Sequence, residues 1–260
     1  MNAFTTSDGL RIAYRRSGTG PALVLLHGFI ADGRVWRTQI DDFSRDFDVI
    51  AWDAPGCGQS SDPPEDFSME DYARCLLALL DDAGIEVPHL LGLSWGGTLA
   101  LEFHHLCPQH VRSMIIADAY AGWTGSLGAQ DAHARLNRCL RESQLPAADW
   151  VPQWVPGAFS AGAPQEVLDE LASIMWDFHP VGFRAMSRAL HPDFSDALSG
   201  ISVPTLLIWG ADDARSPLIC GEKIASTDPA SSSSPTPVIP PTWNNPPAST
   251  PKSAPFLLQR

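Results

Sequence analysis

The chain has 260 residues, 44% of them hydrophobic, and carries a formal net charge of −13 at pH 7 with a pI near 4.8. This length and apolar content are enough for one folded unit with a full core and an inserted subdomain. The acidic surface repels phosphate backbones and anionic lipid, which argues against nucleic acid or a membrane surface as a partner.

The sequence also indicates a compartment. No apolar run is long enough to span a bilayer, and the start of the chain, MNAFTTSDGLRIAYRRSG, lacks a charged segment followed by an apolar one. The five cysteines are scattered and form no C-x-x-C pair, a pattern typical of reduced, structural thiols. We therefore expect a cytoplasmic protein.

Short apolar runs predict β-strands along the chain. They are ALVLL at 22–26, VIAW at 49–52, HLL at 89–91, MIIA at 114–117 and TLLIW at 205–209. The segment DFSMEDYARCLLALLDDAG predicts a helix with Ser68 as N-cap and Gly84 near its end. Strands alternating with helices predict an α/β protein with a mostly parallel, doubly wound sheet covered on both faces.

The strand pattern disappears in the second half of the chain. Residues 1–120 are expected to form the first part of the core, 121–190 a helical, tryptophan-rich cap over a pocket, and 191–227 the second part of the core. Any single tryptophan of the cap is expected to be a core residue. Residues 228–260 contain nine prolines and many serines, which predicts a disordered tail in place of a last strand and helix.

The pentapeptide GLSWG carries the strongest chemical signal. Gly92, Ser94 and Gly96 fit the pattern G-x-S-x-G, directly after a predicted strand and directly before the helical GTLALEFHHL. A nucleophilic serine needs a sharp turn there, and flanking glycines let the neighbouring backbone approach without a Cβ clash. Ser94 is therefore the candidate nucleophile.

A second motif, LLHGF, ends the first hydrophobic strand. An acyl-transfer enzyme needs hydrogen-bond donors aimed at the developing oxyanion, and the backbone N–H groups of Phe29 and Trp95 could supply two. His27 is expected to shape this loop and not to act as a base.

A third motif, LLIWGADDARSP, places carboxylates after an apolar strand. A carboxylate at the carboxyl end of a strand can orient an imidazole and stabilise its charge. Asp213 is the preferred candidate, Asp212 the near alternative, and Asp118, which also ends a strand, the third.

Together these motifs resemble the α/β-hydrolase family over about residues 5–227, on the segments HGF at 27–29, DAPGCGQS at 53–60, GLSWGG at 92–97 and GADDARSP at 210–217. The resemblance implies a serine hydrolase of small carboxylic esters or lactones, most similar to the 3-oxoadipate enol-lactonase and proline iminopeptidase branches. It implies Ser94 as nucleophile, Asp213 as acid, and Phe29 and Trp95 as oxyanion donors. No clustered ligand set or phosphate-binding loop is present, so no metal or organic cofactor is expected.

The family places a catalytic histidine after the acid, usually as Gly-His, but no histidine follows His191 in this chain. His179 and His191 are alternatives from the cap region. A shifted codon frame would permit Asp-Ala-Gly-His, with glycine from Pro237/Val238 and histidine from Val238/Ile239. One hypothesis is therefore a frameshift near Thr227. The alternative is a non-catalytic, ligand-binding or degenerate member of the same fold, and the sequence fixes neither the substrate nor the oligomeric state.

Overall fold

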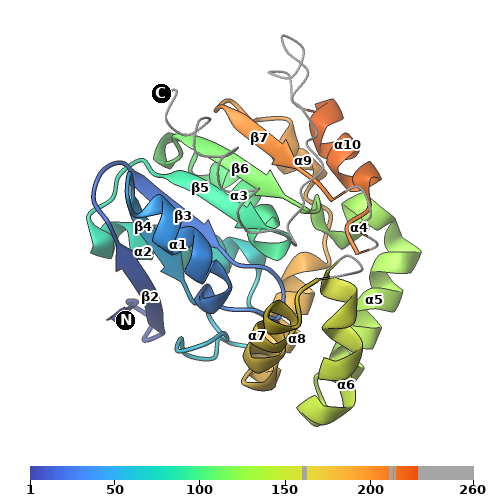
Figure 1. Cartoon of the computed structure of the whole chain (residues 1–260). Helices are drawn as coiled ribbons and strands as arrows, with labels where there is room; N and C mark the ends of the chain where they lie inside the picture. Colours follow the sequence, from blue (N-terminus) through green and yellow to red (C-terminus); the bar gives the residue numbers. More distant parts are fainter. Residues whose placement is uncertain (160–162, 211–212, 214, 228–260) are drawn as a thin grey trace.

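The computed structural model describes residues 1–159, 163–210, 213 and 215–227. Strands and helices alternate along most of this part of the chain (Figure 1). The strands are β1 Asn2–Thr5, β2 Arg11–Ser17, β3 Ala22–Leu26, β4 Asp48–Trp52, β5 His89–Leu93, β6 Ser113–Ala117 and β7 Thr205–Ile208. The α-helices are α1 Arg37–Phe43, α2 Met69–Ala83, α3 Trp95–Leu106, α4 Gly122–Leu127, α5 Ala129–Glu142, α6 Ala147–Trp154, α7 Gln165–Trp176, α8 Pro180–Leu190, α9 Ser195–Leu198 and α10 Leu218–Thr227. Three short 3-10 helices are η1 Gly33–Trp36, η2 Pro108–His110 and η3 Pro156–Ala158.

The described strands form one sheet of seven in the order β1-β2-β4-β3-β5-β6-β7. From β4 to β7 the neighbours run parallel, whereas β1 and β2 are antiparallel additions at one edge. After β3 the chain first adds β4 on one side and then β5 on the other. The order therefore reverses at β3, and in such sheets ligands bind beyond the carboxyl ends of the strands at this point.

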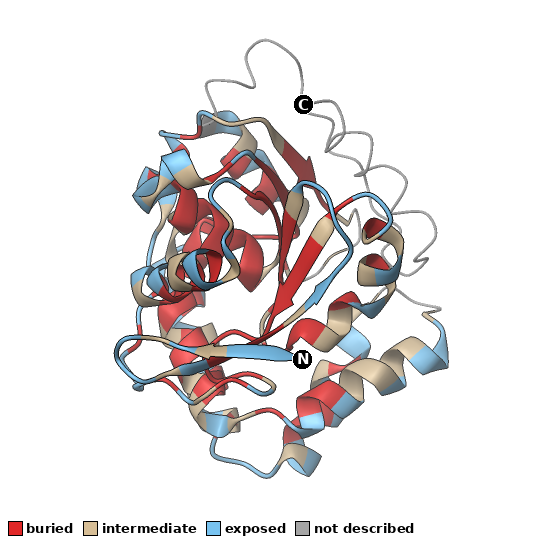
Figure 2. Cartoon of the chain, turned by 90° about the vertical axis from the view of Figure 1, so that its left-hand side faces the viewer, coloured by how far each residue is buried: buried red, intermediate tan, exposed pale blue. Residues whose placement is uncertain are grey.

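Both faces of the sheet are buried, because alternate strand residues enter two separate cores. Val24 and Leu26 of β3 belong to the larger core, together with residues of α2 and α3. Leu23 and Leu25 belong to a smaller core with aromatic residues of η1 and α1. Figure 2 shows the buried strands in the middle of the molecule, with exposed residues toward the outside. The doubly wound α/β architecture predicted from the apolar runs is thus confirmed.

The predicted helix after β4 has the expected ends. The Asp71 backbone N–H donates to the Ser68 hydroxyl at 3.2 Å, and the Ser68 N–H donates to the Asp71 carboxylate at 3.0 Å, which completes a capping box. Gly84 ends α2 in the left-handed region at φ +70°. Because an L side chain is strained there, glycine is the residue that this stop favours.

The antiparallel strands β1 and β2 were not predicted from the sequence. β2 lies near the sheet edge and its side chains run from exposed to buried to exposed, so it has no continuous apolar run. The other five strands lie at their predicted positions, with ends that differ by one or two residues: β4 and β6 begin one residue earlier, β5 extends to Leu93, and β7 ends at Ile208.

Helices α4 to α8 all fall between β6 and β7, in the region predicted to lack strands. In Figure 1, α5 to α8 gather beyond the ends of the central strands. Their aromatic residues differ in position: Trp150 is buried, Trp154 lines a cavity, and Trp176 is 50% exposed. The expectation of core tryptophans therefore holds for Trp150 and for Trp123, whereas Trp154 packs against the core at the cavity wall and Trp176 is exposed.

Two further expectations concern membrane-spanning helices and the C-terminal residues. No helix in the described part of the chain is long and apolar enough to cross a bilayer. The predicted disordered tail, residues 228–260, lies outside the described residues, and so do the codons of the frameshift hypothesis.

Helix α3 lies very close to the sheet at its first turn. A Cβ atom on Gly96 would contact the backbone carbonyl of Leu26 and would lie 2.6 Å from that of His27. A Cβ atom on Gly92 would lie 2.6 Å from the Gly97 Cα. Backbone atoms cannot yield as a flexible side chain can, so these glycines fix the distance between helix and sheet.

We expect Gly96→Ala to lower the free energy of unfolding by about 1–3 kcal/mol through overpacking. Urea titration followed by circular dichroism measures the change. Gly200→Ala is the matched control, since a Cβ atom there has no neighbour within 4 Å. An equally small effect for both variants would contradict the role assigned to the Gly96 contact.

Candidate active site

Ser94 stands at the tight turn between β5 and α3. Its backbone is at φ +52° and ψ −111°, a conformation that is rare for a residue with a side chain. The turn is held by its N–H group, which donates to the Ala117 carbonyl of β6 at 2.7 Å. The Ser94 side chain lines a cavity of about 540 Å³. The strained strand-turn-helix geometry predicted from GLSWG is therefore present.

Phe29 lies on the loop after β3, and Trp95 directly follows Ser94 in the chain. In the parallel pair β3 and β5, Leu26 is in register with Gly92, so Phe29 and Trp95 both stand three residues past paired positions. Trp95 is the first residue of α3, and its N–H therefore has no carbonyl partner within the helix. Phe29 also lines the cavity with its side chain, whereas the Trp95 ring is fully buried.

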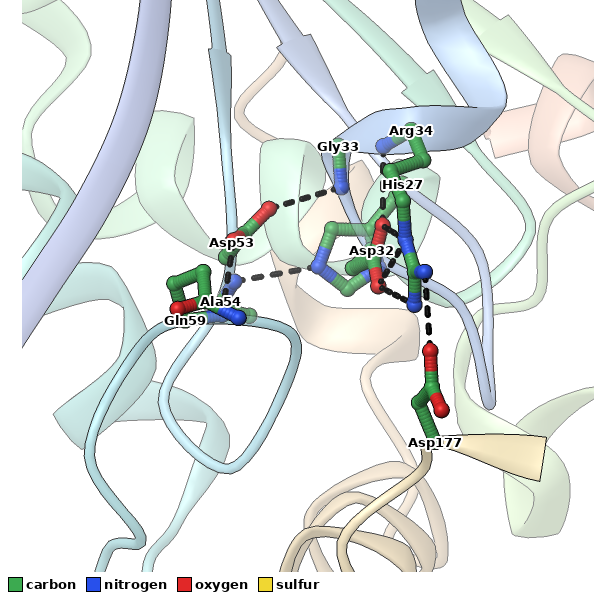
Figure 3. A network of polar contacts seen from close by, with 8 residues as sticks. All are labelled: His27, Asp32, Gly33, Arg34, Asp53, Ala54, Gln59 and Asp177. Atoms are coloured by element: carbon green, nitrogen blue, oxygen red, sulfur yellow. Dashed lines mark hydrogen bonds and ion pairs between the residues drawn. The ribbon is translucent and has the colours of Figure 1, made fainter. Parts of the chain in front are cut away.

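A buried polar network shapes the loop after β3 (Figure 3). The Ala54 N–H donates to His27 Nε2 at 3.0 Å, and His27 Nδ1–H donates to the Gly28 carbonyl at 2.9 Å. Burial also lowers the pKa of His27, so the ring is neutral. With both nitrogens engaged, His27 joins two loops and is not free to act as a base, as the sequence indicated.

A second part of this network connects the loop after β3 to the junction of α7 and α8. Arg34 donates to both oxygens of Asp32, at 2.8–3.0 Å, and its other nitrogen donates to Asp177 at 3.0 Å (Figure 3). These carboxylates raise the pKa of Arg34. Asp177 directly follows α7, so this arginine links the loop that carries Phe29 to the α7–α8 junction.

Two of the described aspartates line the same cavity as Ser94. Asp213 follows β7, and its Oδ1 accepts hydrogen bonds from the backbone N–H groups of Arg215 at 2.7 Å and Ser216 at 2.9 Å. Asp118 ends β6 at φ +48°, and its Oδ1 accepts from the Gly210 N–H at 2.8 Å. The structure thus brings together Asp213 and Asp118, while Asp212 lies outside the described residues.

The surroundings of Asp118 and Asp213 differ. Asp118 is only 9% exposed, and burial, aided by the nearby Asp213 charge, raises its pKa to about 7 even though the Gly210 N–H opposes the shift. Near neutral pH, Asp118 is therefore protonated in a large fraction of molecules. Asp213 is half-buried and has two backbone donors on one oxygen, an environment that suits a fixed negative charge.

None of the eight histidines is among the residues that line this cavity. His179 Nδ1 pairs with Asp62 at 2.6 Å near the surface, and the His191 ring stacks edge-on against His133 at 6.3 Å. Neither alternative base from the cap region is thus placed beside Ser94. Within the described residues, no group of three or more His, Cys, Asp or Glu side chains could hold a metal ion.

The cavity also contains groups that the sequence analysis missed. Arg135 and Arg138 of α5 and Arg215 beside Asp213 all line it, between aromatic residues that include Tyr120 and Trp154. A signal was available on α5, because Arg135 lies between the buried positions Ala132 and Cys139 on the inner side of that helix. An arginine in an otherwise buried stripe indicates a polar cavity.

Comparison with known proteins places the chain in a family. A family model described as the alpha/beta hydrolase fold matches residues 21–137. A putative carbamate hydrolase, RutD, of Pseudomonas syringae pv. syringae is 30% identical over 212 residues, which cover 76% of this chain and 77% of the relative. Uncharacterized mycobacterial proteins are 37% identical over 116 residues, but that match spans only 34% of their length.

Solved structures show the same architecture. A thermophilic esterase from Thermogutta terrifontis superimposes with a TM-score of 0.80 at 26% identity, covering 88% of this chain and 87% of that one. An enol-lactonase from Burkholderia xenovorans LB400 gives a TM-score of 0.80 at 20% identity, with 88% of each chain covered. The latter identity shows a shared fold and no more.

The raised pKa of Asp118 predicts a pH effect on stability. Between its ordinary pKa of 3.8 and about 7, the folded state holds a proton that the unfolded state has released. The contribution of Asp118 to the free energy of unfolding therefore falls as pH rises through this window, by at most about 1.4 kcal/mol per pH unit. Urea unfolding at several pH values should show this slope reduced in Asp118→Asn. Equal slopes in both proteins would contradict a raised pKa.

Proposed function

Because the chain belongs to the α/β-hydrolase family, we propose that it is a serine hydrolase of small carboxylic esters or lactones, acting through an acyl-enzyme on Ser94. The observation that carries the proposal is the placement of Ser94. It stands on a strained turn at the wall of a 540 Å³ cavity, with the Asp213 carboxylate lining the same cavity. Cavities of this size accommodate small organic molecules.

In the proposed reaction, Ser94 Oγ attacks the ester carbonyl while its proton passes to a base. The oxyanion accepts hydrogen bonds from the backbone N–H groups of Phe29 and Trp95. The base then protonates the leaving alkoxide, and the C–O bond breaks to leave an acyl-serine. Water attacks the acyl-serine with the same base as acceptor, which releases the carboxylic acid and restores Ser94.

We assign the acid to Asp213 and not to Asp118. A carboxylate that orients an imidazolium must be charged when the proton transfer occurs. The pKa of about 7 would leave Asp118 protonated for much of the time near neutral pH. Asp118 instead accepts the hydrogen bond from Gly210, which holds the end of β7 beside β6.

The base is proposed to be a histidine that the shifted frame after codon 227 would encode. In the chain as given, the described cavity has no histidine, which favours a second candidate function. That candidate is a non-catalytic ligand-binding protein that retains the cavity and the oxyanion donors. The two functions differ in one observable property, the reactivity of Ser94.

The substrate class follows the chemistry that the relatives share. One relative is named a putative carbamate hydrolase, and one structural neighbour is an esterase. Carbamates, esters and lactones all contain a carbonyl bonded to a heteroatom that leaves after attack. We also propose that residues 121–190 act as a cap that closes this small-molecule site, in a cytoplasmic protein.

A fluorophosphonate probe tests the reactivity of Ser94. We expect slow labelling of the chain as given, and labelling faster by roughly a thousandfold or more when one base inserted at codon 227 restores the second frame. The readout is intact mass against time. Ser94→Ala is the control for the labelled site and should gain no mass in either frame.

Two results would count against the hydrolase proposal. Labelling that stays slow in the restored frame would favour the ligand-binding function. Labelling at a residue other than Ser94 would show that the nucleophile was assigned incorrectly. In the restored frame, Asp213→Asn should slow labelling much more than Asp118→Asn, because only Asp213 is assigned to orient the base.

A further inference from the structure

Two arginines that line the cavity form no ion pair with another described residue. Arg135 and Arg215 are half-buried, and none of the ion pairs among the described residues involves either of them. Their charged neighbours in the cavity wall are paired: Arg138 with Glu142 at 2.8 Å, and Glu170 with Arg37 at 3.0 Å. Of the three arginines that line the cavity, Arg135 and Arg215 are thus the two without an ion pair to a described residue.

Both guanidinium groups are fixed in place by neutral groups. Arg135 donates to the Tyr120 hydroxyl at 2.9 Å and to the Arg215 carbonyl at 3.3 Å. Its Cζ lies 5.6 Å from the centre of the Tyr120 ring and 5.7 Å from that of Trp123. Aromatic faces and carbonyl oxygens hold a cation in position but leave its charge uncompensated.

Arg215 is held in the same way. One of its nitrogens donates to the Trp154 carbonyl, and its Cζ lies 5.2 Å from the centre of the Trp154 ring. Gly157 lies against the same guanidinium group, since a Cβ atom there would be in van der Waals contact with Arg215 Nη2 at 3.4 Å. Each arginine has five N–H groups, so donors remain on both for a ligand.

An uncompensated charge in a partly buried site is unfavourable unless a ligand completes it. Burial lowers the pKa of Arg215, which shows that this cost is felt, although arginine remains charged at physiological pH. The carboxylates that share the cavity relieve this cost only in part, because the charge of Asp213 opposes the lowered pKa of Arg215 without cancelling the effect of burial. Asp213 directs one oxygen to two backbone N–H groups, and Asp118 is protonated in part near neutral pH.

We propose that Arg135 and Arg215 form a subsite for a carboxylate of the substrate, so that the natural ester or lactone carries a free carboxylate in addition to the bond that is cleaved. This inference rests on the proposed hydrolase function for the cleaved bond only. The planar guanidinium fork matches carboxylate geometry, and the aromatic walls suit an aliphatic segment between the two ends. A doubly charged phosphate is disfavoured by Asp213 in the same cavity.

A pair of probes that differ only at one end isolates this subsite. The probe 5-amino-5-oxopentanoate has a carboxylate where pentanamide has a methyl group, and both carry an amide in place of the ester, so their binding requires no turnover. Isothermal titration calorimetry with the full chain should show the carboxylate probe binding about ten- to a hundredfold more tightly, as charge-assisted hydrogen bonds allow. The preference should weaken as salt is added.

Arginine variants then locate the effect. Arg135→Gln and Arg215→Gln should each reduce the preference to less than about threefold while leaving pentanamide affinity unchanged, since only the charge contact is removed. An unchanged pentanamide affinity also shows that the variant is folded. Arg141→Gln removes the same charge from an exposed position of α5 and should keep the full preference.

The outcomes separate this proposal from the hydrolase function. Equal affinity for the two probes in the unmodified chain, or a preference that survives both arginine variants, overturns the subsite whether or not Ser94 reacts. Tighter binding of butyl phosphate than of the carboxylate probe overturns the assignment to a carboxylate. A carboxylate preference that depends on both arginines supports the subsite even if the fluorophosphonate never labels Ser94.

Discussion

The contact between the first turn of α3 and the ends of β3 and β5 determines the position of the candidate site. Gly96 meets the carbonyls of Leu26 and His27, and Gly92 meets Gly97, so no side chain separates helix from sheet. At the turn between these elements, Ser94 has a backbone φ of +52° and lines the cavity. Phe29 and Trp95 each stand three residues past Leu26 and Gly92, which are in register in the β3–β5 pair. The packing of the whole sheet thus stabilises the strained backbone of one residue, Ser94.

The sequence allowed a good prediction of those parts of the fold that depend on local chemistry. Five strands have continuous apolar runs because both of their faces are covered, and α2 has its own start and stop residues in Ser68 and Gly84. The edge strands β1 and β2 lack such runs, because partial exposure mixes polar and apolar side chains. β1 pairs with β2 alone, and β2 is joined to the rest of the sheet by its pairing with β4, a contact that no short window of sequence contains.

The same distinction applies to the site. The turn at Ser94 and the acid candidates stand in short motifs at strand ends, where sequence context indicates their position. The choice between Asp118 and Asp213 needed burial and hydrogen-bond partners, which arise only when β6 and β7 lie side by side. Arg135 and Arg215 are 80 residues apart, and each alone is an ordinary arginine. That both line one cavity, with no ion pair to any residue the structure describes, appears only in three dimensions.

The carbonyl of Arg215 joins two parts of the molecule. Arg215 follows Asp213 by two residues in the chain. Its carbonyl accepts hydrogen bonds from the Tyr120 hydroxyl and from Arg135 of α5. A displacement of α5 would therefore either break the Arg135 hydrogen bonds or move the backbone at Arg215. The position of α5 is in this way coupled to a backbone group only two residues from the Asp213 carboxylate.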